Sequence, residues 1–591
     1  MMRRPLRPLA RILEARAKGE NPDTIERENL RARHEAERDR LRAQAEGRLL
    51  VLAVFFLCGF ALVGLRMGHL AGSEPEEPRA ATTTAKILAA RADIVDRKGR
   101  ILATNFTTHS LYAQPPQMID KERAARELAR IFPDLDAEEL HADFTGARKF
   151  IWIKRRISPE QQQAVHDIGD PGLRFGPREM RLYPNGRLAA HVLGGAKFGR
   201  EGVRSAEVVG RAGVEKAFDT ELRDPGRARE PLRLSLDLTV QAAVERVLAG
   251  GMRLMNAKAA SAILMDVETG EVVSLVSLPD FDPNERPTGG PKDDRSPLFN
   301  HAVQGVYELG STFKIFTAAQ ALEEGLVTPS TIMDTEGPMT WGRYRIRDFR
   351  DHGDEMSVED VIVKSSNIGT ARMALMIGGE RQQAFLKRLG LFETTSLEMP
   401  EAGTARPLLP PRWSDIVTMT ASYGHGISAS PMHLAAAYAT IANGGRKVEP
   451  TLLVRETSAP GEQVISEETS LALRRMMRQA VVRGTASFGE VPGYAVGGKT
   501  GTADKPNPQG GYYEDKVIAT FASVFPSDAP RYVLVVTLDE PEETSGEEPR
   551  RTAGWTAVPV GAEIIRRAAP LLGLAPEIED GATVGVTLAA N

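Results

Sequence analysis

The sequence predicts a multidomain α+β protein attached to a membrane by one N-terminal helix, and three observations carry this prediction. The chain has 591 residues, which is too long for one ordinary hydrophobic core. Residues 49–65 form an apolar run without a charge. Beyond residue 231 the patterns change from strands to helices and back to strands. This order favours an antiparallel sheet backed by helices, with a helical subdomain inserted.

The composition is that of a globular protein and excludes several functions. Apolar residues make up 42% of the chain and charged residues 26%. The net charge of −4 gives no indication of nucleic-acid binding. Cys58 is the only cysteine, so a disulfide within the chain is impossible and a cysteine-rich metal site is excluded.

The run LLVLAVFFLCGFALVGL, residues 49–65, is just long enough to span a bilayer. We expect a membrane anchor over residues 49–70, rather than a buried core helix or a cleaved signal peptide, because a long charged segment precedes the run and a polar one follows. Positive charge before the run predicts a cytoplasmic N-terminus and a single-pass inner-membrane protein whose remainder is periplasmic. The arginines concerned are Arg3, Arg4, Arg7, Arg11, Arg38, Arg40, Arg42 and Arg48.

The segments on either side of the predicted anchor have different characters. Residues 1–48 are expected to be a cytoplasmic segment with a solvated helix over 24–46, and residues 71–85 a linker. Residues 86–230 predict a non-catalytic domain. Within it, ADIVDRKGRILATN predicts two strands joined by a tight turn at 97–99, and Ser158-Pro159-Glu160 predicts a helix start.

Residues 231–570 predict a second domain, and the tail 571–591 is assigned no role. RLSLDLTVQAAVERVLAGGM predicts a strand that leads into a helix, and SAILMDVETGEVVSLVSLP predicts a hairpin turning at 268–270. Helices are expected from Ser311 to about residue 444. VIATFASVFP and RYVLVVTLDEP predict two strands near the end.

In the stretch YELGSTFKIF, Gly310 and Ser311 are expected to break and cap a helix start, and Ser311 and Lys314 lie on one face of that helix. A serine hydroxyl needs a base to become a nucleophile, and a lysine amine can be that base only when it is neutral. Burial or a second cation nearby lowers the pKa of a lysine. A chain this long contains roughly one or two Ser-x-x-Lys pairs by chance, so further motifs must decide.

Two further motifs follow in order. VKSSNIGT contains Ser365 and Asn367, and GGKTGTA contains Lys499, Thr500, Gly501 and Thr502. The second run lacks the glycine spacing of a nucleotide phosphate loop, so a strand is the better assignment, with Gly501 allowing a ligand to approach the backbone. Each motif alone is more often a helix cap or a turn, whereas the ordered set of three is rare by chance.

This ordered set resembles that of the penicillin-recognising serine enzymes. The chain is similar to class B penicillin-binding proteins in blocks such as RLYPNGRLAAHVLG, GRAGVEKAFD and SYGHGISASPMHLAAAYATIANGG. The resemblance implies a pedestal domain of the dimerisation type followed by a transpeptidase domain, and it is greater to the division-specific branch than to the elongation branch. Leu309 stands where a proline is common in the family.

The resemblance also implies a role for each residue of the three motifs. Ser311 would attack the carbonyl between two terminal D-alanines of a stem peptide, and Lys314 would accept its proton. Ser365 would carry a proton to the leaving D-alanine, and Asn367 would hold the substrate and orient Lys314. Lys499 would supply positive potential, Thr500 and Thr502 would bind the terminal carboxylate, and backbone N–H groups of Ser311 and Thr502 would form the oxyanion hole.

The expected partners are peptidoglycan stem peptides, β-lactams, the inner membrane, a membrane glycan polymerase of the FtsW type and other division proteins. No metal or cofactor is implied. The alternatives are an elongation-specific transpeptidase, a β-lactamase, a carboxypeptidase, and a non-enzymatic division scaffold or β-lactam sensor.

Overall fold

The computed structural model describes residues 13–72, 91–201, 206–227, 230–289, 291, 293–455, 461–507 and 509–577. The predicted linker, the last part of the predicted tail and the first four arginines of the N-terminus lie largely outside these residues. The chain divides into two compact units, one of Met1–Ala80, Leu111–Arg155 and Pro159–Phe175, the other of Ala81–Ser110, Arg156–Ser158 and Gly176–Asn591.

The first unit contains one long continuous helix, α2 (Pro22–Gly72), which includes both the expected polar helix and the apolar run. Its stretch Glu46–Gly68 has a mean hydropathy of 2.5 and none of it is buried in the protein, so this helix is long and apolar enough to cross a membrane. The unit also contains α3 (Lys121–Ile131), α4 (Ala137–Thr145) and α5 (Pro159–Ile168). Helix α5 begins at Pro159, as Ser158-Pro159-Glu160 predicts.

The second unit starts with the predicted tight turn. Strands β1 (Ile94–Val95) and β2 (Ile101–Ala113) pair in antiparallel fashion, and the backbone N–H groups of Lys98 and Arg100 both donate to the Asp96 carboxylate. This unit also contains most of β4 (Leu173–Leu182) and all of α6 (Ala190–Leu193), β5 (Gly195–Glu201), β6 (Ala206–Ala212), α7 (Gly213–Ala217) and α8 (Asp219–Leu222), whereas most of β3 (Ile151–Ile157) belongs to the first unit.

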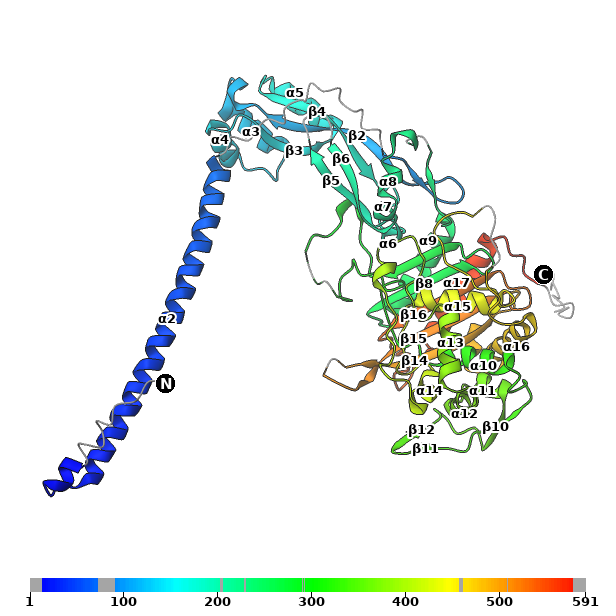
Figure 1. The fold of residues 1–591 in the computed structure, drawn as a ribbon. Coiled ribbons are helices and arrows are strands. Elements are labelled where there is room, and N and C mark those ends of the chain that lie inside the picture. The colour runs from blue at the N-terminus through cyan, green and yellow to red at the C-terminus, as the bar shows by residue number, and fades with distance from the viewer. Residues whose placement is uncertain are drawn as a thin grey trace. The chain divides into compact units, whose positions relative to one another are not determined.

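A five-stranded antiparallel sheet forms the centre of the rest of this unit, in the order β14-β15-β16-β8-β9 (Figure 1). Its strands are β8 (Ala259–Asp266), β9 (Val272–Leu278), β14 (Gly497–Pro506), β15 (Tyr512–Phe525) and β16 (Tyr532–Asp539). The hairpin at 268–270, the pair of late strands and the strand assignment of the Lys-Thr-Gly motif are therefore confirmed.

Both faces of this sheet are buried, which explains why its strands read as continuous apolar runs rather than alternating ones. In β16, Val533 and Val535 pack into one core with helix α15, whereas Leu534 and Val536 pack into another with α9 and α17. The covering helices are α9 (Leu238–Leu254), α15 (Pro431–Ala442) and α17 (Ala557–Leu571). Helix α9 follows β7 (Leu232–Arg233), as predicted.

The helical subdomain lies between β9 and β14 in the sequence, which confirms the predicted order of strands, helices and strands. Its helices are α10 (Lys314–Glu323), α11 (Val358–Lys364), α12 (Asn367–Ile377), α13 (Gly379–Arg388), α14 (Asp415–Ala421) and α16 (Glu467–Arg483). Four short strands interrupt it: β10 (Ile332–Asp334), β11 (Met339–Trp341), β12 (Tyr344–Ile346) and β13 (Glu355–Ser357).

Candidate active site

Ser311 lies in a tight 3-10 turn, Gly310–Phe313, immediately before α10. The sequence suggested that Gly310 and Ser311 break and cap this helix. The break is confirmed, because Gly310 has a φ of 55°, but Ser311 is inside the turn and Leu309 occupies the capping position without a side-chain cap bond. The Ser311 hydroxyl is therefore not used as a helix cap.

Two glycines allow the Ser311 turn to pack closely against its surroundings. A Cβ on Gly501 would lie 2.2 Å from the Leu309 carbonyl oxygen, and one on Gly424 would lie 2.2 Å from the Gly310 carbonyl oxygen. The expected reason for a glycine at 501 was the approach of a ligand. Instead, the backbone of the chain's own serine turn occupies that position, because β14 packs directly against the turn.

We expect Gly424→Ala to lower the free energy of unfolding by about 2 kcal/mol or more, because the methyl group would displace the Gly310 carbonyl and Gly424 has a φ of 77°. The matched control is Gly342→Ala. Gly342 also has a positive φ, 58°, but nothing lies within 4 Å of its missing Cβ. Thermal melting of the two variants measures this loss. Equal losses in both variants would contradict the packing argument.

The Ser365 hydroxyl lies between the amines of the two motif lysines. Lys314 Nζ donates to Ser365 Oγ at 3.1 Å and also to its carbonyl oxygen, and Lys499 Nζ lies 2.9 Å from the same Oγ. Lys499 Nζ also donates to the Thr500 carbonyl oxygen at 3.2 Å. The structure thus brings together one residue from each of the three motifs, far apart in the sequence.

Burial makes both lysines easier to deprotonate. Neither side chain is exposed to solvent. Desolvation holds the pKa of Lys314 well below its usual value, and the neighbouring Lys499 lowers it further while Asp348 opposes the shift. Desolvation lowers the pKa of Lys499 to about 7. The shift in the pKa of Lys314 favours the neutral amine, which a lysine acting as a base requires.

Ser365 adopts a left-handed backbone conformation, with φ 66° and ψ 44°, at the end of α11. This conformation costs a non-glycine residue about 1 kcal/mol or more. It turns the chain so that Ser366 begins α12, where the Ser366 hydroxyl accepts from the Gly369 N–H at 3.0 Å. A strained residue whose hydroxyl contacts two buried amines is typical of a functional position.

Asp348 is a site residue that sequence reasoning missed. Its carboxylate accepts hydrogen bonds from Ser366 Oγ at 2.6 Å, from the Ile368 N–H at 3.0 Å and from the Asn367 N–H, all at the N-terminus of α12. It belongs to a charged loop, DFRDHGDE, in which nothing in the sequence distinguishes one aspartate from the others.

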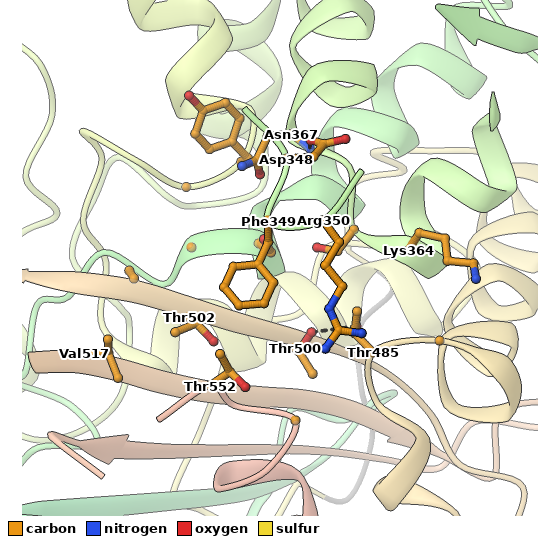
Figure 2. Close-up of a pocket in the computed structure, with 18 of the residues that line it drawn as sticks. Asp348, Phe349, Arg350, Lys364, Asn367, Thr485, Thr500, Thr502, Val517 and Thr552 are labelled. Atoms are coloured by element: carbon orange, nitrogen blue, oxygen red, sulfur yellow. Dashed lines mark hydrogen bonds between the residues drawn. The ribbon is translucent and has the colours of Figure 1, made fainter. Parts of the chain in front are cut away.

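Asn367, Thr500 and Thr502 line a pocket of about 800 Å³ together with Ser311 and Ser365, whereas Gly501 does not line it (Figure 2). Asn367 lies at its edge, and its side-chain amide donates to the Arg347 carbonyl at 2.8 Å. Thr500 and Thr502 both reach it from β14. Thr500 Oγ forms a 2.8 Å hydrogen bond with Thr485 Oγ, a second residue that the sequence did not indicate, and Thr502 Oγ accepts from the Ala553 N–H at 3.0 Å.

Among the described residues, no group of three or more His, Cys, Asp or Glu side chains is arranged to hold a metal ion. The pocket lining includes the hydroxyls of Ser311, Ser365, Thr500 and Thr502, and the buried amines of Lys314 and Lys499 contact the Ser365 hydroxyl. Such a set can activate a serine, stabilise negative charge on an oxygen and move a proton between nitrogen and oxygen atoms.

Two domain families match the chain. The penicillin-binding protein dimerisation domain matches residues 86–227, and the penicillin-binding protein transpeptidase domain matches residues 260–565. A probable peptidoglycan D,D-transpeptidase FtsI of Caulobacter vibrioides is 34% identical over 565 residues, with 93% of each chain covered. The peptidoglycan D,D-transpeptidase FtsI of Escherichia coli is 30% identical over 490 residues, with 77% of this chain and 80% of the relative covered.

The fold also matches a solved structure. Penicillin-binding protein 3 of Mycobacterium tuberculosis, complexed with aztreonam, superposes with a TM-score of 0.62 at 26% identity, covering 83% of this chain and 98% of that one. Domain order, relatives and fold agree with the resemblance seen in the motifs. The chain belongs to the class B penicillin-binding proteins.

Proposed function

We propose that this protein is a peptidoglycan D,D-transpeptidase that cross-links stem peptides of the septal cell wall through an acyl-enzyme on Ser311, and that β-lactams acylate the same serine. The observation that carries the proposal is the Ser365 hydroxyl between two buried lysine amines, in the pocket that contains Ser311. The names of the relatives and the aztreonam complex of the structural neighbour support it.

Lys314 takes the hydroxyl proton as Ser311 attacks the carbonyl carbon of the penultimate D-alanine. The Ser311 and Thr502 N–H groups stabilise the resulting oxyanion, each worth about 3 kcal/mol. Ser365 passes the proton to the amine of the terminal D-alanine as its C–N bond breaks. An amine of a neighbouring stem peptide then attacks the ester, and its proton returns to Ser311 by the same route.

Asn367 holds the amide backbone of the donor peptide, and Thr500 and Thr502 bind its terminal carboxylate. Gly501 serves this site by letting β14 approach the serine turn. In this proposal residues 86–230 are the pedestal and residues 231–570 the transpeptidase domain.

We propose that the apolar helix anchors the enzyme in the inner membrane as a single-pass protein, with residues 1–48 in the cytoplasm and residues 71–591 in the periplasm; the length and hydropathy of this helix support the proposal. Because the arginines before the apolar run outnumber those just after it, the positive-inside rule favours this orientation. The chain shows no domain for glycan polymerisation in its matched families, so we propose that a polymerase of the FtsW type and other division proteins act with it.

Mass spectrometry of the intact protein after incubation with a labelled penicillin tests the proposal. We expect a stable adduct of one penicillin on the wild type and none on Ser311→Ala. Rapid release of hydrolysed penicillin would instead indicate a β-lactamase, and release of D-alanine without cross-linking a carboxypeptidase. A fluorescent fusion should localise to the septum; uniform side-wall labelling would favour the elongation branch. Full cell-wall activity of Ser311→Ala would favour a scaffold or sensor.

A further inference from the structure

If the proposed function holds, the pocket must offer a positive charge to the carboxylate of the substrate. This inference rests on that function and identifies the side chain that supplies the charge. The donor peptide ends in a carboxylate, which binds best to a cation that stays charged. Lys314 must be neutral to act as a base, and Lys499 loses its charge near neutral pH, since burial lowers its pKa to about 7. Neither lysine provides a constant positive charge.

Arg350 provides a charge of that kind. It lies in the loop between β12 and β13 and lines the pocket with Ser311, Thr485 and Thr500. Figure 2 shows its side chain extending into the pocket toward Thr500 and Thr485, whereas the side chain of Lys364 points away. A guanidinium remains protonated at every pH at which the protein is folded.

The Arg350 guanidinium is not engaged elsewhere: across the described parts of the chain, no hydrogen bond, ion pair or ring contact involves it. Of the three arginines in the pocket lining, Arg347, Arg350 and Arg483, the last is different. It forms ion pairs of 2.6 Å with both Glu359 and Asp360, so its charge is already compensated.

The backbone before Arg350 is held against the second catalytic motif. The Arg347 carbonyl accepts from the Asn367 side chain at 2.8 Å, and the Asp348 carboxylate accepts from Ser366 Oγ at 2.6 Å. These bonds fix the loop two residues before Arg350. They also occupy the Asp348 carboxylate at the N-terminus of α12, so that it is not the counter-ion of Arg350.

We propose that Arg350 is a substrate-binding residue that pairs with the terminal carboxylate of the donor peptide, alongside the hydroxyls of Thr500 and Thr502. The planar guanidinium can donate two parallel hydrogen bonds to a carboxylate, which fixes the orientation of the terminal D-alanine as well as its charge. The same contact would bind the carboxylate of a β-lactam. The preference of the enzyme for a donor peptide that ends in a charged carboxylate thus depends on a loop outside the three motifs.

A pair of substrates that differ only in charge tests this role. One is a depsipeptide thioester ending in a free carboxylate, and the other is the same thioester ending in a carboxamide. For Arg350→Gln in the full-length protein, we expect kcat/KM to fall about 5- to 50-fold for the carboxylate and to stay unchanged for the amide. Arg350→Lys should recover part of the loss, because it keeps the charge without the paired donors.

Arg343→Gln is the matched control. Arg343 is in the β11–β12 turn, is exposed and contacts Tyr344, so this change removes the same charge outside the pocket. An equal loss for both substrates in Arg350→Gln would mean a structural role and would overturn the inference, as would no loss for either. If the wild type turned over neither substrate and formed no penicillin adduct, the proposed function would be overturned as well.

Discussion

Replacing Lys314 by methionine should reduce penicillin acylation about 10³- to 10⁴-fold, the upper range for loss of a general base. Methionine has a similar length and no charge, so it fits a position that is fully buried. The expected defect is in the rate of acylation, because the change leaves Ser311 and the carboxylate-binding threonines in place. Stopped-flow measurement with a fluorescent penicillin gives this rate directly.

The stability of Lys314→Met should also depend on pH differently from that of the wild type. The direction of the difference follows from the pKa of Lys314. Burial holds the pKa of Lys314 well below its value in the unfolded chain. Between these two pKa values the unfolded state binds one more proton than the folded state, so this group makes the protein more stable as pH rises through that range. Lys314→Met lacks the group. The melting temperature of Lys314→Met relative to that of the wild type should therefore be higher at pH 7 than near pH 10.

Lys314→Arg is the second arm of this experiment. An arginine keeps the donor groups but cannot lose its proton, so acylation should be as slow as in Lys314→Met. Appreciable acylation in Lys314→Arg would contradict the role of a neutral base. If the difference in melting temperature between Lys314→Met and the wild type stayed constant across this pH range, the burial of an uncharged lysine would be contradicted.

The sequence allowed most of the sheet and the three motifs to be predicted, for physical reasons. The strands of residues 259–278 and 512–539 are long apolar runs bounded by turn residues, and both faces of the sheet are buried. The motifs carry polar side chains in apolar surroundings, which is rare enough to be informative. The central contact, the Ser365 hydroxyl between two lysines, depends on residues that the fold brings together from distant positions.

Other features could not be predicted, because they depend on tertiary packing. Asp348 becomes a cap only because its loop folds back onto the start of α12. The close contact of Gly501 with the Leu309 carbonyl depends on how β14 packs against the serine turn. The left-handed conformation of Ser365 has no signal in VKSSNIGT, where glycine or asparagine would be the residues expected at such a position.

Two replacements of Ser365 can separate its hydroxyl from its backbone. Ser365→Ala and Ser365→Gly both remove the hydroxyl that contacts the two lysines, so we expect both to slow acylation by about 10²- to 10³-fold. Their stabilities should differ. Alanine keeps the strain of a left-handed backbone at φ 66°, whereas glycine relieves it, so Ser365→Gly should be the more stable by about 1 kcal/mol.

The comparison is decisive because the two roles of Ser365 predict different acylation rates for Ser365→Gly. If the residue carries a proton between Lys314, Lys499 and the leaving nitrogen, the two variants acylate equally slowly despite their different stabilities. If Ser365 acts only by shaping the end of α11, Ser365→Gly should acylate nearly as fast as the wild type while Ser365→Ala does not. Stability is measured by thermal melting, and the rate by penicillin labelling of the same preparations. Equal slowness together with unequal stability would place the function of Ser365 in its hydroxyl, between two amines that burial keeps easy to deprotonate.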